Sequence, residues 1–448
     1  MPNLLGVKLG ALTLPLLGAG VVATAVTSEI VAKPEVRPGP VRITYWEKWT
    51  GFEGDAIRDT VNTFNKSQDK IFVDLLIVST VDQKALMATA AGVPPDVVGL
   101  YGTNVAQFAD DQALVPLDKM CEEAGIVRDN YVPVFYDIGV YNGKVYALPT
   151  TPATTALHYN TAMLKEVGVE KPPQTIEAMT ELADKLTKRG DNGKITRSGF
   201  LPAEPGWWNW GWGTVFGGKL WDGKETLTTD SPEMVRGYKW LRGFSERYGP
   251  GELQSFRSGF GNFSSPQNAF MAEQVAMVLQ GVWMYNFIDK FNPKLQWAAV
   301  PFPHPADRPD LANHTYADMD VIVIPRGSKH PKEAFEFIKF LQSQKGMEQL
   351  CLLQRKISPL SKVSVEFYAK HPNPYIKLFY DLSYSKNAIP PPKLGLWPQL
   401  LAEMNNAFDE VTLMTSTPEG ALKKVKTRMQ PLLTDYLKRL KLREQVVE

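Results

Sequence analysis

The sequence has few residues of the kinds that form disulfide frameworks or metal centres. It contains two cysteines and five histidines in 448 residues. Cys121 and Cys351 stand far apart, each in a segment with a helical pattern, so their spacing favours neither a framework nor a metal site. We expect both to be buried free thiols. A disulfide between them stays open, because the sequence does not show whether their Cα atoms are within reach.

Sequence motifs of catalysis are also missing. The chain has no HExxH, no Gly-x-Ser-x-Gly elbow, no Walker loop and no GxGxxG after a strand. The carboxylate pairs at 110–111 and 122–123 fall where solvated turns or helices are expected. We therefore predict that the protein is not an enzyme and uses no cofactor or metal. A glycoside hydrolase stays open as the enzyme alternative, because its two carboxylates come from distant points of a chain.

An excess of charge of either sign is absent as well. The 49 basic and 48 acidic residues leave a formal net charge of +1. A nucleic-acid-binding surface needs a basic stripe, so no nucleic-acid partner is predicted. The hydrophobic share of 44% and the length suffice for two or three domain-sized units with packed cores.

One long apolar run stands at the N-terminus, over residues 9–26. Ala23 and Ala25 satisfy the small-x-small rule for signal cleavage, so residues 1–25 are predicted to be a signal peptide and 26–40 a proline-rich tether. An uncleaved anchor is the alternative, because about 18 apolar residues just span a bilayer. No cysteine is near, which excludes a lipoprotein. In either case we expect the bulk of the protein at the periplasmic or extracellular face of the cytoplasmic membrane.

Strands and helices alternate in the first part of the mature chain. Strands are predicted at 41–46, 71–77 and 96–100, and helices at 55–65 and 83–91. This order is typical of a parallel sheet with crossover helices.

The second part repeats the pattern. Ser231 before Pro232 predicts a helix start, and Thr417 before Pro418 predicts the start of the last long helix. A strand is predicted at 320–325 and an amphipathic helix at 332–341. We therefore expect an α/β protein throughout.

Tryptophan is unusually frequent. Of eleven tryptophans, four fall within residues 207–212, in a loop rich in glycine and proline. Core packing explains about half of such residues, because tryptophan is highly buried on average. The other explanation is sugar binding: aromatic rings cover the apolar face of a pyranose, while carboxylates and amides pair with its hydroxyls.

Several segments match one known family in the right order. Residues 148–164 contain a leucine-proline step, a turn rich in threonine and proline, and Tyr159-Asn160 before a helix. Ala276-Met277 is followed by Gly281-Val282-Trp283 at a helix start. Together with Pro95-Asp96 and Pro116-Leu117, these segments resemble the extracellular solute-binding proteins of family 1, the carbohydrate-binding component of ABC importers.

The resemblance extends from about residue 41 to about residue 440 and implies a two-lobed class II periplasmic-binding-protein fold with discontinuous lobes and a hinge. In that fold the ligand binds between the lobes, which close by a hinge movement. The expected division of this chain is as follows: lobe 1 from 41–150 and 316–370, lobe 2 from 155–303 and 374–448, and hinge crossovers at 150–155, 303–316 and 370–374.

The expected ligand-binding residues follow strand ends, where open α/β sheets bind ligands, or match the family's ligand positions. Trp283 is favoured for ligand stacking over core packing, while Trp46 and Trp397 are evenly balanced between the two roles. The full predicted set is Trp46, Trp49, Tyr101, Thr151, Trp208, Trp283, Asp318 and Trp397.

The function that the resemblance implies is the capture of a mono- or oligosaccharide and its delivery to the permease subunits of an ABC transporter, by a monomeric protein. A glycerol-phosphodiester or polyol ligand is the alternative within the family. It would need a cationic anchor, for which Arg355 or Lys393 would serve.

Overall fold

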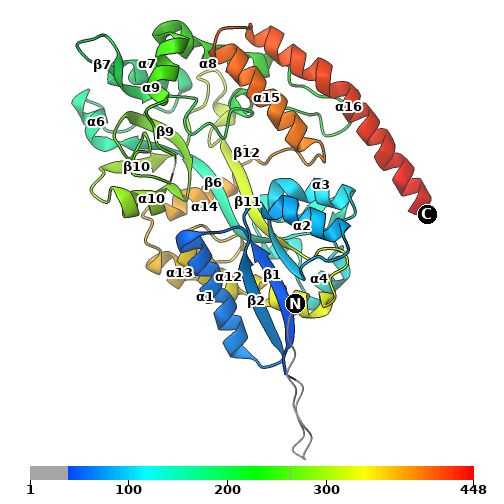
Figure 1. Ribbon diagram of the computed structural model, residues 1–448. Helices are drawn as coiled ribbons and strands as arrows, with labels where there is room; N and C mark the ends of the chain where they lie inside the picture. The colour runs from blue at the N-terminus through cyan, green and yellow to red at the C-terminus, as the bar shows by residue number, and fades with distance from the viewer. Residues whose placement is uncertain (1–38, 263, 448) are drawn as a thin grey trace, which may run out of the picture. The chain divides into compact units, whose positions relative to one another are not determined.

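The computed structural model describes residues 39–262 and 264–447 (Figure 1). From Pro40 onward these residues form one compact unit. The predicted signal peptide at 1–25 and nearly all of the predicted tether lie outside the described residues. Within them, no helix has the length and apolar character that a membrane span requires.

The central feature is a long mixed sheet with the strand order β2-β1-β3-β11-β6-β9-β8-β7. β1 pairs in parallel with β2 and β3, whereas β11 runs antiparallel to both β3 and β6. β10 and β12 pair with β6 and β11 outside this order. The strands are β1 (Val41–Glu47), β2 (Ile71–Ile77), β3 (Val97–Tyr101), β6 (Leu148–Asn160), β7 (Lys188–Arg189), β8 (Ile195–Phe200), β9 (Val275–Gly281), β10 (Trp297–Val300), β11 (Thr315–Val323) and β12 (Ala388–Ile389).

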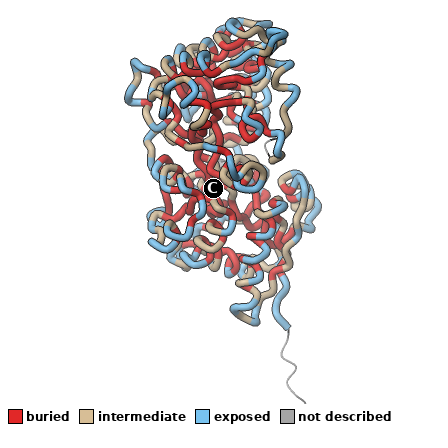
Figure 2. The backbone as a smooth tube through the Cα atoms, turned by 90° about the vertical axis from the view of Figure 1, so that its left-hand side faces the viewer, coloured by how far each residue is buried: buried red, intermediate tan, exposed pale blue. Residues whose placement is uncertain are grey.

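Two large hydrophobic cores lie along this sheet, one in each lobe. Figure 2 shows buried backbone in both lobes and in the chain that connects them. The first core joins β1, β2 and β3 to four longer helices: α1 (Gly51–Ser67), α2 (Val81–Ala90), α11 (Pro331–Gln342) and α12 (Gln344–Gln354). The second core joins β8 and β9 to α7 (Ile176–Leu186), α8 (Pro232–Tyr248), α15 (Trp397–Thr412) and α16 (Pro418–Val447).

Shorter elements complete the two lobes. They are α3 (Val105–Asp110), α4 (Asp118–Ala124), α5 (Pro133–Ile138), β4 (Val140–Tyr141), β5 (Lys144–Val145), α6 (Thr161–Glu166), α9 (Pro250–Arg257), α10 (Met284–Phe291), α13 (Val365–Lys370) and α14 (Ile376–Ser383).

Most of the predicted elements are confirmed. β1, β2 and β3 match the three predicted strands to within one residue at each end. The Ser231 hydroxyl accepts a hydrogen bond from Met234 N at the start of α8, and the Thr417 hydroxyl accepts one from Gly420 N at the start of α16. Cys121 on α4 and Cys351 on α12 are free and buried, as expected, so the alternative of a disulfide between them is wrong.

The predicted turn in the Pro/Thr-rich segment was wrong, because that segment is the first half of strand β6. Pro149 pairs with Val321 and Pro152 with Met319 on β11, and the register shifts between these two partners. Proline removes one ladder donor, which an irregularity of this kind accommodates. The β-branched threonines favour extended backbone and find partners for their hydroxyls: Thr150 donates to the Asp320 carbonyl at 2.8 Å.

Strand β6 links the two cores directly. Leu148 near its start packs in the first core, while Leu157 and Tyr159 near its end pack in the second. β11 crosses in the opposite direction and begins five residues before the predicted strand, at Thr315. The third crossover was expected at 370–374, but the chain still packs in the first core beyond those residues: Phe379 on α14 belongs to that core.

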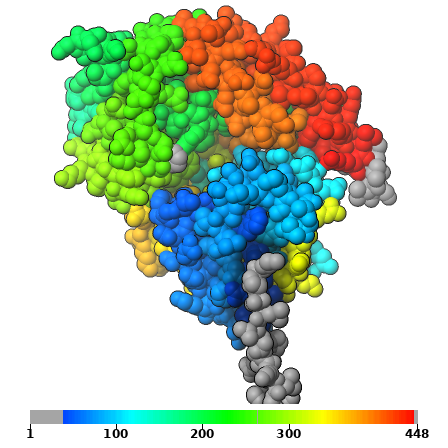
Figure 3. Space-filling model, viewed as in Figure 1, coloured from blue at the N-terminus to red at the C-terminus, as the bar shows by residue number. Residues whose placement is uncertain are grey.

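A polar contact between the two lobes involves the last helix, α16. The Tyr436 hydroxyl on α16 donates to Asp110 Oδ2 at 2.5 Å and lies 2.5 Å from the Tyr141 hydroxyl. Gly395 N donates to the Tyr436 hydroxyl at 3.1 Å. Asp110 and Tyr141 belong to α3 and β4 of the first lobe, and Figure 3 shows the orange C-terminal segment directly above the light-blue part of the chain that includes α2 and α3.

We expect Tyr436→Phe to lower the free energy of unfolding by about 1–3 kcal/mol, because it removes the hydroxyl that donates to Asp110, contacts the Tyr141 hydroxyl and accepts from Gly395 N. Denaturant unfolding measures this loss. Tyr384→Phe is the matched control, since the Tyr384 side chain is exposed and its loss should change stability by less than about 0.5 kcal/mol. Equal stability of the two variants would contradict the structural importance of this contact.

Candidate ligand-binding site

The two lobes enclose a cavity of about 750 Å³. This volume lies within the range of roughly 300–1,000 Å³ that is usual for small-molecule sites. Residues of the loop after β1, of β3 and of β11 line one side, and residues from 207–210 and the starts of α10 and α15 line the other. The cavity therefore lies where the strands that carry the chain from one lobe to the other pass between them.

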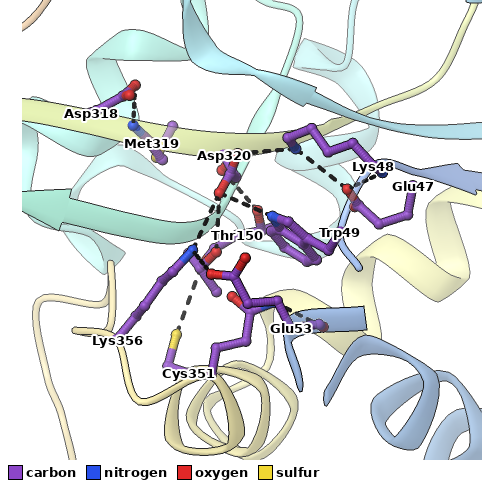
Figure 4. A network of polar contacts seen from close by, with 12 residues as sticks. Glu47, Lys48, Trp49, Glu53, Thr150, Asp318, Met319, Asp320, Cys351 and Lys356 are labelled. Carbon is purple, nitrogen blue, oxygen red and sulfur yellow. Dashed lines mark hydrogen bonds and ion pairs between the residues drawn. The ribbon is translucent and has the colours of Figure 1, made fainter. Parts of the chain in front are cut away.

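Asp320 on β11 is the centre of a buried polar network on the first-lobe side (Figure 4). Its carboxylate lies 2.9 Å from Lys48 Nζ and 3.6 Å from Lys356 Nζ. The indole Nε1 of Trp49 donates to Oδ2 of the same carboxylate at 3.3 Å. Residues from the β1 loop, from β11 and from the segment after α12 are thus held together by one side chain.

Two further carboxylates complete the network. Glu53, in the first turn of α1, pairs with Lys356 at 2.8 Å, and Glu47 pairs with Lys48 at 3.3 Å. Gly99 on β3 makes room for the Glu47 carboxylate, because a Cβ at that position would lie 1.9 Å from Glu47 Oε2. Glu47 also accepts a hydrogen bond from the Tyr45 hydroxyl at 2.6 Å.

Asp320 and its two lysines keep their charges. Burial alone would lower the pKa of Lys48, but the carboxylates of Asp320 and Glu47 outweigh burial and raise it. The pKa of Lys356 is raised in the same way, against burial, by Glu53 and Asp320. Burial would raise the pKa of Asp320, yet the two lysines lower it. All three groups are therefore ionised at neutral pH.

Asp318 lies two residues before Asp320 on β11, but its surroundings differ (Figure 4). Burial, followed by repulsion from Asp320, raises the pKa of Asp318 to about 6. Its Oδ1 accepts a hydrogen bond from Met319 N at 2.7 Å. In the part of the chain that the structure describes, no cation forms an ion pair with Asp318, which lines the cavity.

Stacked aromatic rings form the opposite side. Trp208 lies between Tyr316, at 5.0 Å and 13°, and Trp283, at 6.4 Å and 28°. Trp283 stands at the start of α10, and its indole nitrogen donates to Gln280 Oε1 at 3.2 Å. Gly281 is required beside it, because a Cβ there would lie 2.4 Å from the Trp283 ring.

A separate aromatic pair lies at the start of α15. Trp397 is the first residue of that helix, and its ring meets the Trp210 ring edge to face with 5.2 Å between the ring centres.

The structure brings seven of the eight predicted ligand-binding residues to this cavity. The seven lining residues are Trp49, Tyr101, Thr151, Trp208, Trp283, Asp318 and Trp397. Trp46 does not line it: this half-buried residue packs against the first core. Trp46 lies between Tyr45 and Glu47 on β1, and alternate residues of a strand point to opposite faces.

The residues that sequence reasoning missed are chiefly the charged ones. Asp320, Lys356 and Glu53 line the cavity, and Lys48 stands behind them. Asp318 and Asp320 lie on one strand, but the predicted strand began only at Asp320, so the sequence prediction did not place the two carboxylates together. Nothing in the sequence indicated that residues about 270 and 300 positions away from the β1 loop would meet it.

The two cations considered as anchors for a phosphodiester do not line the cavity. Arg355 pairs with Asp289 at 2.6 Å. Lys393 donates to the backbone carbonyls of Asp137 and Val140. Among the residues that the structure describes, no group of three or more His, Cys, Asp or Glu is arranged to hold a metal ion.

A two-lobed α/β unit with an aromatic and carboxylate-lined cavity between the lobes defines a solute-binding protein. Residues 59–374 match the family model described as bacterial extracellular solute-binding protein, and the chain belongs to this family.

Curated relatives agree with this assignment. The chain is 23% identical to the sn-glycerol-3-phosphate-binding periplasmic protein of Pectobacterium atrosepticum, over 88% of this chain and 91% of that protein. It is also 23% identical to the maltotriose-binding protein of Pyrococcus abyssi, over 62% of this chain and 57% of that protein.

Solved structures agree as well. A protein named CpMnBP1, solved with mannotriose bound, superimposes with a TM-score of 0.75 and 28% identity over 86% of this chain and 99% of that chain. The sugar-binding protein MalE of Xanthomonas citri gives a TM-score of 0.73 with 18% identity, over 90% of this chain and all of that one. The expected two-lobed fold is confirmed.

We expect Asp318→Asn to stabilise the unliganded protein above pH 6. The pKa of Asp318 in the folded state, about 6, lies above its ordinary value of 3.8. As the pH rises from 3.8 to 6 the Asp318 carboxyl loses its proton more readily in the unfolded chain than in the folded one, which lowers the free energy of unfolding. The gain in unfolding free energy at pH 8 should be about 1–3 kcal/mol and should vanish below pH 4.

Denaturant unfolding across pH 4–8 measures this difference. Asp381→Asn is the matched control, because Asp381 is exposed on α14 and pairs with Lys377 one turn away. Its effect should be small at every pH. A lower stability of Asp318→Asn at pH 8 would show that the carboxylate has a stabilising partner.

Proposed function

We propose that this protein captures a carbohydrate in the cavity between its lobes, outside the cytoplasm, and delivers it to the permease subunits of an ABC transporter. The observation that carries the proposal is the cavity itself, with stacked aromatic rings on one side and carboxylates on the other. An aromatic face covers the apolar C–H face of a pyranose. Carboxylates accept hydrogen bonds from its hydroxyls, which would be costly to bury without partners.

The relatives support the same ligand class. One curated relative is named for maltotriose and one solved neighbour holds mannotriose. For this chain we propose Trp49, Tyr101, Thr151, Trp208, Trp283, Asp318 and Trp397 as ligand-contacting residues. Thr151 and Tyr101 would supply hydroxyls from β6 and β3.

The alternative ligand, a glycerol phosphodiester or polyol, has one relative in its favour, the glycerol-3-phosphate-binding protein. A phosphate needs a cation or several N–H donors. Lys356 is already paired with Glu53 and Asp320, and Lys290 lies exposed at the cavity edge. The pairing of Lys356 and the exposed position of Lys290 favour an uncharged polyol or a saccharide over a phosphodiester.

We also propose that the protein performs no chemistry on its ligand. Glycoside hydrolysis requires two carboxyl groups on opposite sides of the scissile bond. Asp318 and Asp320 instead lie two residues apart on one strand, and Asp320 is bound by two lysines. The remaining carboxylate, Glu53, pairs with Lys356.

Closure of the lobes on the ligand is part of this proposal. β6 and β11 carry the chain between the two cores, and we propose the hinge at 150–155, at 303–316 and at 383–389, where the packing changes from the first core to the second. Closure would bring the aromatic side onto the carboxylate side, so that a permease distinguishes loaded from empty protein. We expect the mature protein to act as a monomer and to bind no nucleic acid.

A thermal-shift screen tests the proposed ligand class. Saccharides and sn-glycerol-3-phosphate are compared at equal concentration, and a saccharide should raise the melting temperature, since ligand at 100 times its Kd adds about 2.7 kcal/mol. Chromatography of the incubated saccharide should show no product. A response to glycerol phosphate alone, or turnover, would contradict the proposal.

Trp283→Ala tests the position of the site. We expect it to weaken binding of the saccharide found in the screen by about 1–3 kcal/mol, because one stacking ring is lost. The matched control is Trp240→Ala on α8, where the half-buried indole donates to Thr180 and does not line the cavity. Calorimetric titration should show unchanged affinity for the control. Unchanged affinity for Trp283→Ala as well would remove the aromatic side from the site.

A further inference from the structure

The charges around the cavity are not balanced. The formally charged residues that line it, within the described chain, are Glu53, Asp318, Asp320, Lys290 and Lys356. Three of these are carboxylates and two are lysines, and no arginine is among them. The cavity therefore offers more negative than positive groups to a ligand.

Neither buried lysine of the network is available to an anion. The side chains of Lys48 and Lys356 are only 7% and 6% exposed. They face three carboxylates, those of Glu47, Glu53 and Asp320, at distances of 2.8–3.6 Å. Two positive against three negative charges leave the network with a net charge of −1. A ligand phosphate or carboxylate placed beside it would meet repulsion in a region of low dielectric constant.

Asp318 adds a further negative group that the network does not neutralise. The charged groups near it are Asp320, which repels it, and Lys48 and Lys356, which are bound to other carboxylates. Lys393 and Tyr141 line a small cavity on its other side. Lys393 is held by two backbone carbonyls and forms no ion pair with Asp318.

An uncompensated carboxylate in a buried cavity is costly to the fold and is typical of a functional site. A ligand that supplies a cation removes this cost. The electron-rich faces of the surrounding tryptophans also attract cations rather than anions. The unpaired carboxylate and the tryptophan faces therefore both favour a ligand with a positive charge.

We propose that the saccharide bound by this protein carries an amino group, whose ammonium pairs with the Asp318 carboxylate, and that uronates and sugar phosphates are rejected. This inference rests on the proposed function, because it assumes that the cavity binds a saccharide. Asp318 acts as the specificity-determining residue, and the paired lysines contribute by offering no anion site.

Calorimetric titration at pH 7.5 with matched disaccharides tests the inference. The probes are the glucosamine, glucose, N-acetylglucosamine and glucuronate disaccharides, in both α-1,4 and β-1,4 linkage. We expect the glucosamine form to bind at least tenfold more tightly than the glucose form of the same linkage, and the glucuronate form to bind at least tenfold more weakly. N-acetylation removes the charge and should abolish the preference.

Asp318→Asn should bring the glucosamine-to-glucose preference close to one, whatever its effect on the absolute affinity for the glucose disaccharide. Asp381→Asn makes the same change in net charge on the exposed face of α14 and should keep the full preference. Raising the pH from 7.5 to 9.5 should remove the preference of the unmodified protein, because the sugar ammonium loses its proton while Asp318, whose pKa is about 6, stays ionised.

The outcomes separate the inference from the proposed function. Equal or tighter binding of the neutral disaccharide overturns the inference and leaves the carbohydrate proposal standing. A preference for the amine that persists in Asp318→Asn also overturns it. If the folded protein binds none of these saccharides and none in the wider screen, the proposed function itself fails.

Discussion

Asp320 is the side chain on which the site depends. One carboxylate lies against Lys48, Lys356 and the indole nitrogen of Trp49. These partners come from the β1 loop and from the segment after α12, so Asp320 fixes both to the crossing strand β11. Removing one member of a buried ion network leaves an uncompensated charge and commonly costs several kcal/mol. The first-lobe side of the cavity is therefore a rigid surface.

This rigidity has a consequence for the charge of the cavity. Because Lys48 and Lys356 hold Asp320, Glu47 and Glu53, no ion pair with either lysine is left for Asp318, a carboxylate that lines the cavity. The second lobe contributes shape and apolar surface through the stack of Tyr316, Trp208 and Trp283. Recognition is thus divided between a charged side and an aromatic side. Specificity would reside in the first and much of the contact area in the second.

Local patterns were enough to predict much of the fold. Strand β2 has the predicted bounds, because a short, mostly apolar run that contains Ile71, Val73 and Ile77 is typical of a strand. Ser231 and Thr417 marked helix starts by their own hydroxyls. The Pro/Thr-rich start of β6 was misjudged, since its extended form depends on β11, a partner about 170 residues away. Tertiary pairing overrode a local turn signal there.

The candidate site was predicted in part for the same reason. Tryptophans in loops after strands, such as Trp208 and Trp283, could be singled out by residue type and position. Trp46 could not be separated from Trp49, because which residue faces the cavity depends on where β1 ends. Lys356 could not be predicted as a site residue, because its place in the site depends on an ion pair with Glu53, about 300 residues earlier in the chain, that forms only on folding.

The account is tested most directly by a crystal structure of the protein with the saccharide that stabilises it. The account predicts one saccharide between the lobes, with a sugar ring against the Trp208–Trp283 side and a polar group of the sugar within hydrogen-bond distance of the Asp318 carboxylate. A saccharide bound on an outer surface, with the cavity holding none, would contradict it.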